Sequence, residues 1–220
     1  MTQIKILLSV PNKHWIHKFV VNRVITLLGD KRYKTTLIMP SHKPYVCNLH
    51  HIVKDFMDSD YDFWLNIDAD NPPSKNPLDL VELKKDIIGV PTPIWHFKDE
   101  KKGERPVYWN AYDLVDDATG YREHQDRNGL QKVDAVGTGC ILIARRVFEN
   151  PEMRKAPFMR RWTEEGLMER GNDMAFCERA RKNGFEIYAH FGYWCDHFSE
   201  LSMHEMHRAY REMYEGVKDG

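Results

Sequence analysis

Two acidic residues stand directly after an apolar segment of the chain, in the sequence Asp68-Ala69-Asp70. The segment before them, residues 61–67, alternates between two sets of side chains in the manner of a β-strand. In an extended chain, residues i and i+2 point the same way, so both carboxylates can reach one divalent cation. Carboxylate oxygens suit magnesium or manganese, whose remaining positions are commonly filled by phosphate oxygens and water. The alternative is a solvated turn, because Asn71-Pro72-Pro73 follows.

Two more segments carry side chains suited to the same chemistry. Asn172-Asp173 stands at an expected helix start, where the helix dipole favours an acidic residue. An ordinary cap explains this pair equally well. His197 follows the last expected strand and could complete a mixed Asp/His metal site, although a single histidine is more often structural.

A glycine-containing turn precedes another apolar segment. Its residues are Gly137, Thr138 and Gly139, and the two glycines permit close approach of the backbone or a positive φ. The turn is not a dinucleotide-binding fingerprint, which needs a strand before it, a helix after it and a third glycine. A tight turn is the simpler interpretation.

The elements that must position these residues follow from the hydrophobic pattern. Strands and helices alternate through the first 91 residues, which predicts an α/β sandwich around a mainly parallel sheet. Hairpins and loops are expected from about 95 to 134. The expected strands are 4–10, 33–39, 61–67, 86–91, 139–144 and 185–189, and the expected helices begin near 15, 46, 77, 172 and 201.

Composition restricts the class of protein. The chain has 220 residues, 42% hydrophobic and 30% charged, and a formal charge of −1, so we expect one folded domain, 1–220, without a global field for a polyanionic partner. No apolar segment is long enough to span a membrane, and the first ten residues read as a strand rather than a leader. Four dispersed cysteines fit reduced thiols, so a soluble, cytoplasmic protein is expected, in the host cytoplasm if the chain is phage-encoded.

Taken together and in order, these segments resemble the nucleotide-sugar glycosyltransferases of GT-A fold, in particular the small soluble enzymes of bacteria and bacteriophages. Residues 63–73 resemble that family's strand and DxD motif, and residues 133–143 its glycine turn and strand. Residues 171–177 are similar to its acidic helix start, and His197 to its late metal-binding histidine. The resemblance implies a GT-A-type, Rossmann-like αβα sandwich with a nucleotide-sugar-binding half (about 1–94), an acceptor-side half (about 95–200) and a C-terminal helix (201–220).

The resemblance also implies roles for residues. The donor is a nucleoside-diphosphate sugar, with UDP as the favoured nucleotide, and the cofactor is Mn²⁺ or Mg²⁺. Asp70 and His197 would hold the cation, Asp68 would position the ribose or a metal-bound water, and Asp173 would be the general base, which implies inversion at the anomeric carbon. The nucleoside would contact Ser9, Val10 and Pro11, and the acceptor side comprises Gly137, Thr138, Gly139, Asn172 and Trp95.

Two departures from the family pattern concern charge. Asn172 replaces the first acid of the usual pair, so Asp173 alone can be the base. At Cys47-Asn48 many relatives have Arg-Asn, with the arginine near the donor phosphates, so Lys43 or another basic residue would have to supply that charge beside Asn48.

The acceptor is open between several hydroxyl compounds. Residues 145–182 contain ten Lys and Arg against seven Asp and Glu, a net of +3 that could meet a phosphate backbone or be an ordinary solvated surface. Some phage relatives glycosylate hydroxymethylated pyrimidines in DNA, which makes DNA the specific acceptor expected. A saccharide or protein hydroxyl is the competing acceptor. Loop aromatics, Trp95 and Trp162 among them, could stack on a base or on a sugar.

Two other functions remain as alternatives. A nucleotidyltransferase would need a glycine-rich phosphate loop after the first strand, which residues 10–15 lack. A non-catalytic binding module could hold zinc, although no closed set of four ligands is evident. Its candidate ligands are Cys47, His50, His51, Cys195 and His197.

Overall fold

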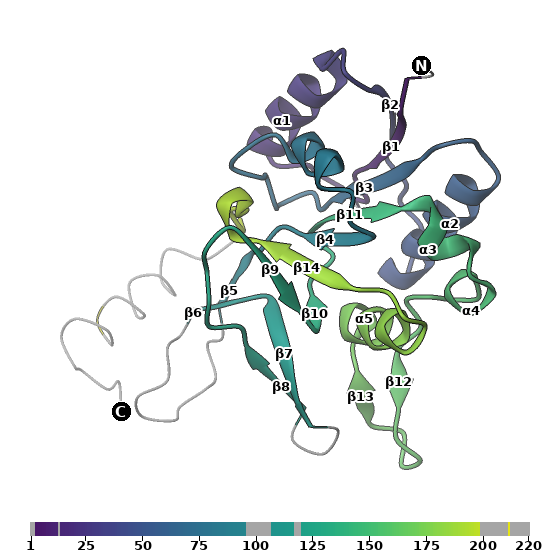
Figure 1. Ribbon diagram of the computed structural model, residues 1–220, viewed down its shortest axis with the longest axis vertical. Coiled ribbons are helices and arrows are strands. Elements are labelled where there is room, and N and C mark those ends of the chain that lie inside the picture. The colour runs from purple at the N-terminus through teal and green to yellow at the C-terminus, as the bar shows by residue number, and fades with distance from the viewer. Residues whose placement is uncertain (1–2, 13, 96–106, 117–119, 199–210, 212–220) are drawn as a thin grey trace.

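A seven-stranded sheet forms the centre of the molecule, in the order β2-β1-β3-β11-β4-β14-β9 (Figure 1). The computed structural model describes residues 3–12, 14–95, 107–116, 120–198 and 211. The strands are β1 (Lys5–Ser9), β2 (Lys34–Ile38), β3 (Phe63–Ile67), β4 (Ile87–Gly89), β9 (Leu130–Val133), β11 (Cys140–Ala144) and β14 (Ile187–His190). Strands β1, β2, β3, β4 and β14 run in one direction, while β9 and β11 run against them. The predicted α/β architecture with a mainly parallel sheet is therefore confirmed.

Helices cover both faces of this sheet. They are α1 (Lys18–Gly29), α2 (Tyr45–Met57), α3 (Arg145–Glu149), α4 (Pro151–Arg154) and α5 (Asn172–Lys182), with 3₁₀ helices η1 (Pro77–Leu83) and η2 (Phe191–Tyr193). Successive strand residues point to opposite faces, so Leu7 and Trp64 enter one core while Leu8 and Leu65 enter the other. The first core is closed by α2, α3, α4 and α5, and the second by α1 and η1.

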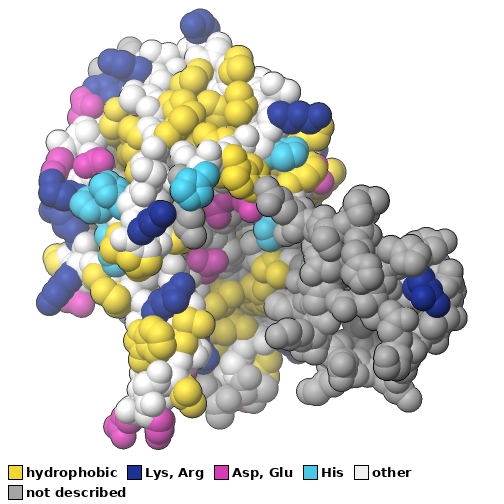
Figure 2. Space-filling model, turned by 180° about the vertical axis from the view of Figure 1, so that it is seen from behind, with side chains coloured by type: hydrophobic (Ala, Val, Ile, Leu, Met, Phe, Trp, Pro, Cys, Tyr) yellow, Lys and Arg dark blue, Asp and Glu magenta, His cyan; other side chains and the backbone are white. Residues whose placement is uncertain are grey.

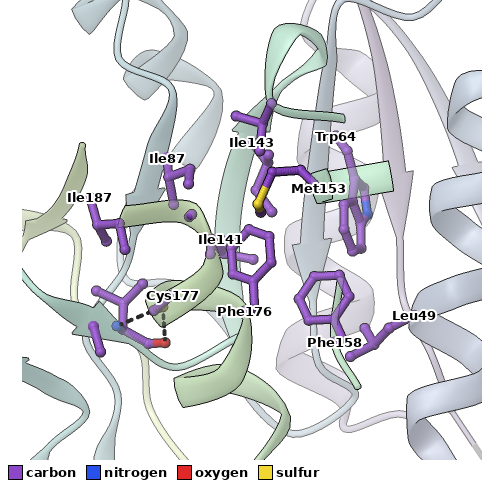
Figure 3. Close-up of a cluster of buried hydrophobic side chains, with 14 of the residues drawn as sticks. Leu49, Trp64, Ile87, Ile141, Ile143, Met153, Phe158, Phe176, Cys177 and Ile187 are labelled. Carbon is purple, nitrogen blue, oxygen red and sulfur yellow. Dashed lines mark hydrogen bonds between the residues drawn. The ribbon is translucent and has the colours of Figure 1, made fainter. Parts of the chain in front are cut away.

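Aromatic rings fill the first core (Figure 3). Phe158 and Phe176 stack with their ring centroids 4.5 Å apart, and Trp64 meets Phe158 edge to face at 5.8 Å. Offset and edge-to-face pairs of this kind are favourable beyond the apolar area that they bury. The contact fixes α5 against β3, and these two elements carry the candidate catalytic residues.

Small antiparallel sheets lie beside the central sheet, as the sequence predicts for residues 95–134, although the β12–β13 pair was not expected. They are β5 (Pro93–Trp95) with β6 (Val107–Trp109), β7 (Ala111–Asp116) with β8 (Gly120–Glu123) and β10 (Ala135–Val136), and β12 (Arg161–Trp162) with β13 (Met168–Arg170). The expected C-terminal helix, 201–220, lies outside the described residues apart from Arg211.

One predicted helix has a different geometry. The segment Pro77–Leu83 is a 3₁₀ helix, which ends at Lys84 in the left-handed region (φ 53°). Its buried residues explain this, because Pro77 with Leu80 and Leu78 with Val81 recur every three positions, the period of a 3₁₀ helix.

Among the described residues, no helix combines the length and apolarity needed to cross a bilayer. All four cysteines are free thiols, and three of them are buried.

Candidate active site

The candidate residues meet at the edge of the sheet where β3 ends. Asp68 follows β3, and its backbone N–H donates to the carbonyl of Gly139 at 2.7 Å. Because β11 runs antiparallel to β3, the turn before β11 lies at this same edge. Asp173 lies in the first turn of helix α5, and its carboxylate accepts a hydrogen bond from Thr138, which belongs to the turn before β11. The DxD segment, the glycine turn and the acidic helix start are thus neighbours in space.

The Asp68 carboxylate is fixed by two donors. Tyr45 donates its hydroxyl to Oδ1 at 2.6 Å, and Asn66 donates Nδ2–H to the same oxygen at 3.0 Å. Burial raises the pKa of Asp68 to about 7, and the charge of Asp70 acts in the same direction, although both hydrogen bonds oppose the shift. A carboxylate withdrawn from water in this way is stabilised by a cation.

Asp70 faces the ring of His197. Its Oδ2 lies 3.8 Å from His197 Nε2, while Nδ1 of the same ring lies 2.9 Å from the carbonyl of Pro93. A carbonyl only accepts, so Nδ1 donates, and Nε2 is the ring nitrogen that faces Asp70. Burial raises the pKa of the Asp70 carboxyl, and His197 opposes that shift.

Asp173 is held by Thr138. The Thr138 hydroxyl donates to Oδ1 at 3.0 Å, and the Thr138 N–H lies 3.4 Å from Oδ2. Burial raises the pKa of Asp173, while these hydrogen bonds and Arg160 oppose the shift. The neighbouring Asn172 is buried and accepts a hydrogen bond from Arg160 Nε at 2.6 Å.

Two clefts open at this edge and share a wall made by Tyr45, Asp68 and Asp70. The first cleft, of about 300 Å³, is lined in addition by Pro11, Asn12, His14, Trp15, His42, Asn48 and Ala69. The second cleft, of about 390 Å³, reaches Asp173 and His197 and is lined further by Asn71, Thr92, Ile94, Asn110, Thr138, Gly139, Arg160, Met168, Gly171, Asn172 and Met174. Figure 2 shows acidic side chains in a hollow near the middle of one face, with histidines around it.

The residues expected at the nucleoside are only partly in the first cleft. Of Ser9, Val10 and Pro11, only Pro11 lines it, because Ser9 and Val10 are fully buried. Asn48, which was expected beside the donor phosphates, lines the same cleft. Ser9 is occupied by internal bonds, because its hydroxyl donates to Asn66 Oδ1 and accepts from Trp64 Nε1, each at 2.7 Å.

The expected phosphate cation, Lys43, is exposed and does not line either cleft. His14 and His42 line the first cleft instead. Asn48 is buried, and its Oδ1 accepts from the backbone N–H of His42, so it orders the loop that presents the His42 ring.

The glycine turn makes room for amide side chains. A Cβ on Gly137 would lie 2.1 Å from Asn110 Nδ2, and one on Gly139 would lie 3.2 Å from Asn71 Cγ. Both asparagines line the second cleft, so close approach explains these glycines. Trp95, which was expected on the acceptor side, ends β5, and its side chain lies outside what the structure describes.

Four polar residues of the site had no signal in the sequence. Tyr45 and Asn66 bond to Asp68, and Asn110 and Arg160 line the second cleft, but the four come from separate segments that meet only after folding. Asn66 had the nearest to a signal, because a polar side chain inside a fully buried strand must find hydrogen-bond partners.

Most Lys and Arg side chains of the basic segment 145–182 make internal contacts. Arg145 donates to the carbonyls of Phe56, Met57 and Tyr61 at the end of α2. Seven others also have partners, and their pairs are Arg146 with Asp86, Arg160 with Asn172, Arg161 with Glu169 and Glu178, Arg170 with the Glu169 carbonyl, Arg179 with the carbonyls of Lys155 and Ala156, Arg181 with Asp134, and Lys182 with Glu178. Five of the ten cations, Arg145, Arg146, Arg161, Arg181 and Lys182, are thus paired with a carboxylate, whereas bonds to carbonyls and to Asn172 leave the charge of Arg160, Arg170 and Arg179 in place.

The residues proposed for a zinc module do not come together. Within the described part of the chain, no group of three or more His, Cys, Asp or Glu side chains is placed to hold a metal ion. Cys195 is buried beside Cys140, whereas Cys47 lies on α2.

Solved structures share this fold. No protein-family model matches the chain, and no curated protein matches its sequence. A197 from STIV is 14% identical, with a TM-score of 0.57 over 90% of this chain and 87% of that chain. GalNAc-T7, in a crystal structure with UDP, GalNAc and Mn²⁺, is 7% identical, with a TM-score of 0.53 over 90% of this chain and 44% of that chain.

The chain thus has a GT-A-like fold, as the resemblance in its sequence implied. At these identities the likeness concerns the fold.

Replacing Asp68 tests its buried charge. The pKa of Asp68 in the folded protein is about 7, against a usual 3.8, so between these values the folded protein holds a proton that the unfolded chain releases. The contribution of this proton to the free energy of unfolding is present in full in acid and is lost as pH rises through about 7. Thermal unfolding in metal-free buffer should show the wild-type melting temperature falling between about pH 4 and about pH 7 more steeply than that of Asp68→Asn. Asp55→Asn, at an exposed position of α2, should keep the wild-type slope. Equal slopes in Asp68→Asn and wild type would contradict the assignment.

Gly137→Ala tests the close approach of Asn110. The new methyl group must displace the Asn110 side chain, whose Oδ1 accepts from the Thr92 N–H at 2.7 Å. We expect a loss of about 1–3 kcal/mol in the free energy of unfolding, measured with denaturant. Gly29→Ala is the control, since a Cβ there meets nothing within 4 Å, and it should not destabilise the fold.

Proposed function

We propose that this protein is a metal-dependent, inverting glycosyltransferase that moves a sugar from a nucleoside-diphosphate sugar, with UDP as the expected nucleotide, to an acceptor hydroxyl. One observation carries the proposal: two clefts share the wall of Tyr45, Asp68 and Asp70, and Asp173 stands in the second. A transferase needs two substrates that meet at one reacting atom, and two adjoining clefts provide for this.

The first cleft suits the nucleoside diphosphate. Its apolar lining includes Pro11 and Trp15, and the Trp15 side chain is 46% exposed and free to pack on a base. The imidazoles of His14 and His42 line the same cleft and can donate hydrogen bonds to phosphate oxygens, the role for which Lys43 was expected. Asp70 lies where this cleft joins the second, which is where the diphosphate would end and the sugar begin.

Asp70 and His197 are the residues that would hold Mn²⁺ or Mg²⁺. Two ligands of one such ion lie at most about 4 Å apart, and their facing atoms are 3.8 Å apart. The bond between His197 Nδ1 and the Pro93 carbonyl is the outer contact typical of a metal-bound histidine. With only two protein ligands, the diphosphate and water would complete the set. A bound divalent ion neutralises the charge that develops on the leaving diphosphate.

Asp68 would bind the donor rather than the cation. Its Oδ1 accepts from both Tyr45 and Asn66, so Oδ2 is the atom available to a ribose hydroxyl. Tyr45 packs against the same carboxylate from α2 and closes the floor between the clefts.

Asp173 would accept the proton of the acceptor hydroxyl. Thr138 orients its carboxylate, and burial strengthens it as a base by raising its pKa. A base on the acceptor side, opposite the leaving group, permits direct displacement and hence inversion. The acceptor oxygen forms its bond to the anomeric carbon as the bond to the diphosphate oxygen breaks, and the hydroxyl proton passes to Asp173.

Asp70→Asn and His197→Ala test the cation site. Wild-type protein should bind UDP more tightly in the presence of Mn²⁺, and Asp70→Asn should lose that gain, about tenfold or more in Kd measured by calorimetry. His197→Ala should need about tenfold more Mn²⁺ for half of the effect. Asp55→Asn serves as the control with unchanged affinity. If Mn²⁺ strengthens UDP binding equally in Asp70→Asn, Asp70 is not a ligand.

Asp173→Asn tests the base. We expect kcat to fall by about 10²–10⁴ while the affinity for UDP and Mn²⁺ stays that of the wild type. In the wild type, kcat should decline toward acid as Asp173 takes up a proton and can no longer accept one. Near-normal turnover of Asp173→Asn would exclude this role.

A further inference from the structure

A short hairpin stands at the mouth of the second cleft. It consists of β12 and β13, and Figure 1 shows it projecting from the α5 side of the molecule, away from the sheet. Its turn is fixed by Gly166, at φ 79°, and by a hydrogen bond from Thr163 N–H to the Leu167 carbonyl at 2.8 Å. Met168 of β13 lines the second cleft, so one face of the hairpin continues the cleft wall.

That face carries an unpaired aromatic side chain. Trp162 is the direct cross-strand partner of Met168, and residues paired in this way lie on the same face of a hairpin. Their exposed fractions are 55% and 52%, although large apolar side chains are normally withdrawn from water. Arg161, the residue before Trp162, turns instead to Glu178 of α5 at 2.5 Å. Met168 thus lines the second cleft and Trp162 stands beside it, outside the cleft wall, while Arg161, on the other side of a register shift in β12, attaches the hairpin to α5.

The carboxylates around this face disfavour a polyanion as its occupant. The exposed residues Glu164 and Glu165 form the tip of the hairpin, and Figure 2 shows acidic side chains at the end of that projection, beyond hydrophobic ones. The described wall of the second cleft has a single Lys or Arg, Arg160, and it is bonded to Asn172. With Asp173 on the same wall, a phosphate backbone would meet repulsion here.

The polar groups of the cleft suit hydroxyls. Asn71, Thr92 and Asn110 are buried and line the second cleft with amide and hydroxyl groups, which bind uncharged donors and acceptors equally well. A pyranose combines such hydroxyls with a flat face of C–H bonds, and that face packs on an indole ring. Cleft and hairpin together fit an uncharged sugar better than a base attached to phosphates.

We infer that the Trp162–Met168 face of the β12–β13 hairpin is the acceptor platform, and that the acceptor is an uncharged saccharide whose ring stacks on Trp162. This inference rests on the proposed transferase function and names its acceptor class. It differs from the expectation of DNA, which rested on the resemblance to phage enzymes and on the +3 charge of residues 145–182.

The test compares acceptors and hairpin variants. Purified protein with Mn²⁺ is first offered UDP-sugars alone, and the sugar that is slowly hydrolysed is then supplied with neutral disaccharides, a hydroxymethylcytosine duplex or a serine-containing peptide. Transfer to a disaccharide is expected, with an acceptor KM that changes by less than about twofold between about 50 and about 200 mM salt. Transfer to the duplex or the peptide alone would overturn the inference.

Variants of the β12–β13 hairpin test whether Trp162 binds the acceptor. Trp162→Ala should raise the disaccharide KM by about tenfold or more while the affinity for UDP is unchanged, and Trp162→Phe should restore most of the loss. Leu167→Ala removes an apolar side chain of the same hairpin that is 67% exposed and is not the cross-strand partner of Met168, and it should keep the wild-type KM. A wild-type KM in Trp162→Ala would overturn the inference even if transfer occurs.

A binding measurement separates this inference from the proposed function. Saturation-transfer NMR of the disaccharides should give signals from their C–H protons with wild-type protein and not with Trp162→Ala. Wild-type protein that neither binds UDP nor hydrolyses any UDP-sugar would contradict the transferase. Saccharide signals that are the same in Trp162→Ala would contradict the platform alone.

Discussion

The Asn66 amide, buried inside β3, ties the two halves of the site together. Its Oδ1 accepts the Ser9 hydroxyl, and its Nδ2 donates both to Asp68 Oδ1 and to the Thr138 carbonyl at 2.8 Å. Thr138 in turn holds Asp173. A buried amide is costly unless its donors and acceptor are satisfied, so this arrangement is specified narrowly. Asn66 lines neither cleft, yet it fixes the position of Asp68, which would bind the donor, relative to Asp173, which would act on the acceptor.

The direction of β11 explains why three distant segments reach one edge of the sheet. In a purely parallel sheet, the turn that leads into a strand lies at the amino ends of the strands, on the side of the sheet opposite to their carboxyl ends. Because β11 is antiparallel to β3 and β4, its preceding turn, Gly137–Gly139, lies beside Asp68. Strand β14 runs parallel to β4, so the chain that leaves it returns toward the same edge, where His197 meets Asp70. One reversed strand thus brings the acceptor-side turn to the end of the DxD strand.

Hydrophobic periodicity predicted the central strands and the helices α1, α2 and α5, and the ends of these elements pointed to Asp68, Asp70, Asp173 and His197 as candidates whose roles stay predictions. It was insufficient for side chains whose role comes from contacts across the fold. Ser9 reads as a residue at a strand end facing a ligand, but its hydroxyl is consumed by Trp64 and Asn66. Tyr45 reads as the start of an amphipathic helix, and only folding sets its hydroxyl against Asp68.

The net charge of a sequence segment likewise does not predict the electrostatic field that a ligand meets at the surface. A net of +3 over residues 145–182 is a property of the sequence, whereas the field that a ligand meets depends on which charges remain unpaired. Arg161 and Lys182 both pair with Glu178, so part of the positive charge is balanced within the fold. The second cleft is lined by three carboxylates and adjoins the exposed Trp162–Met168 pair. Such a surface selects an occupant by shape and hydroxyl groups, and a neutral sugar has both.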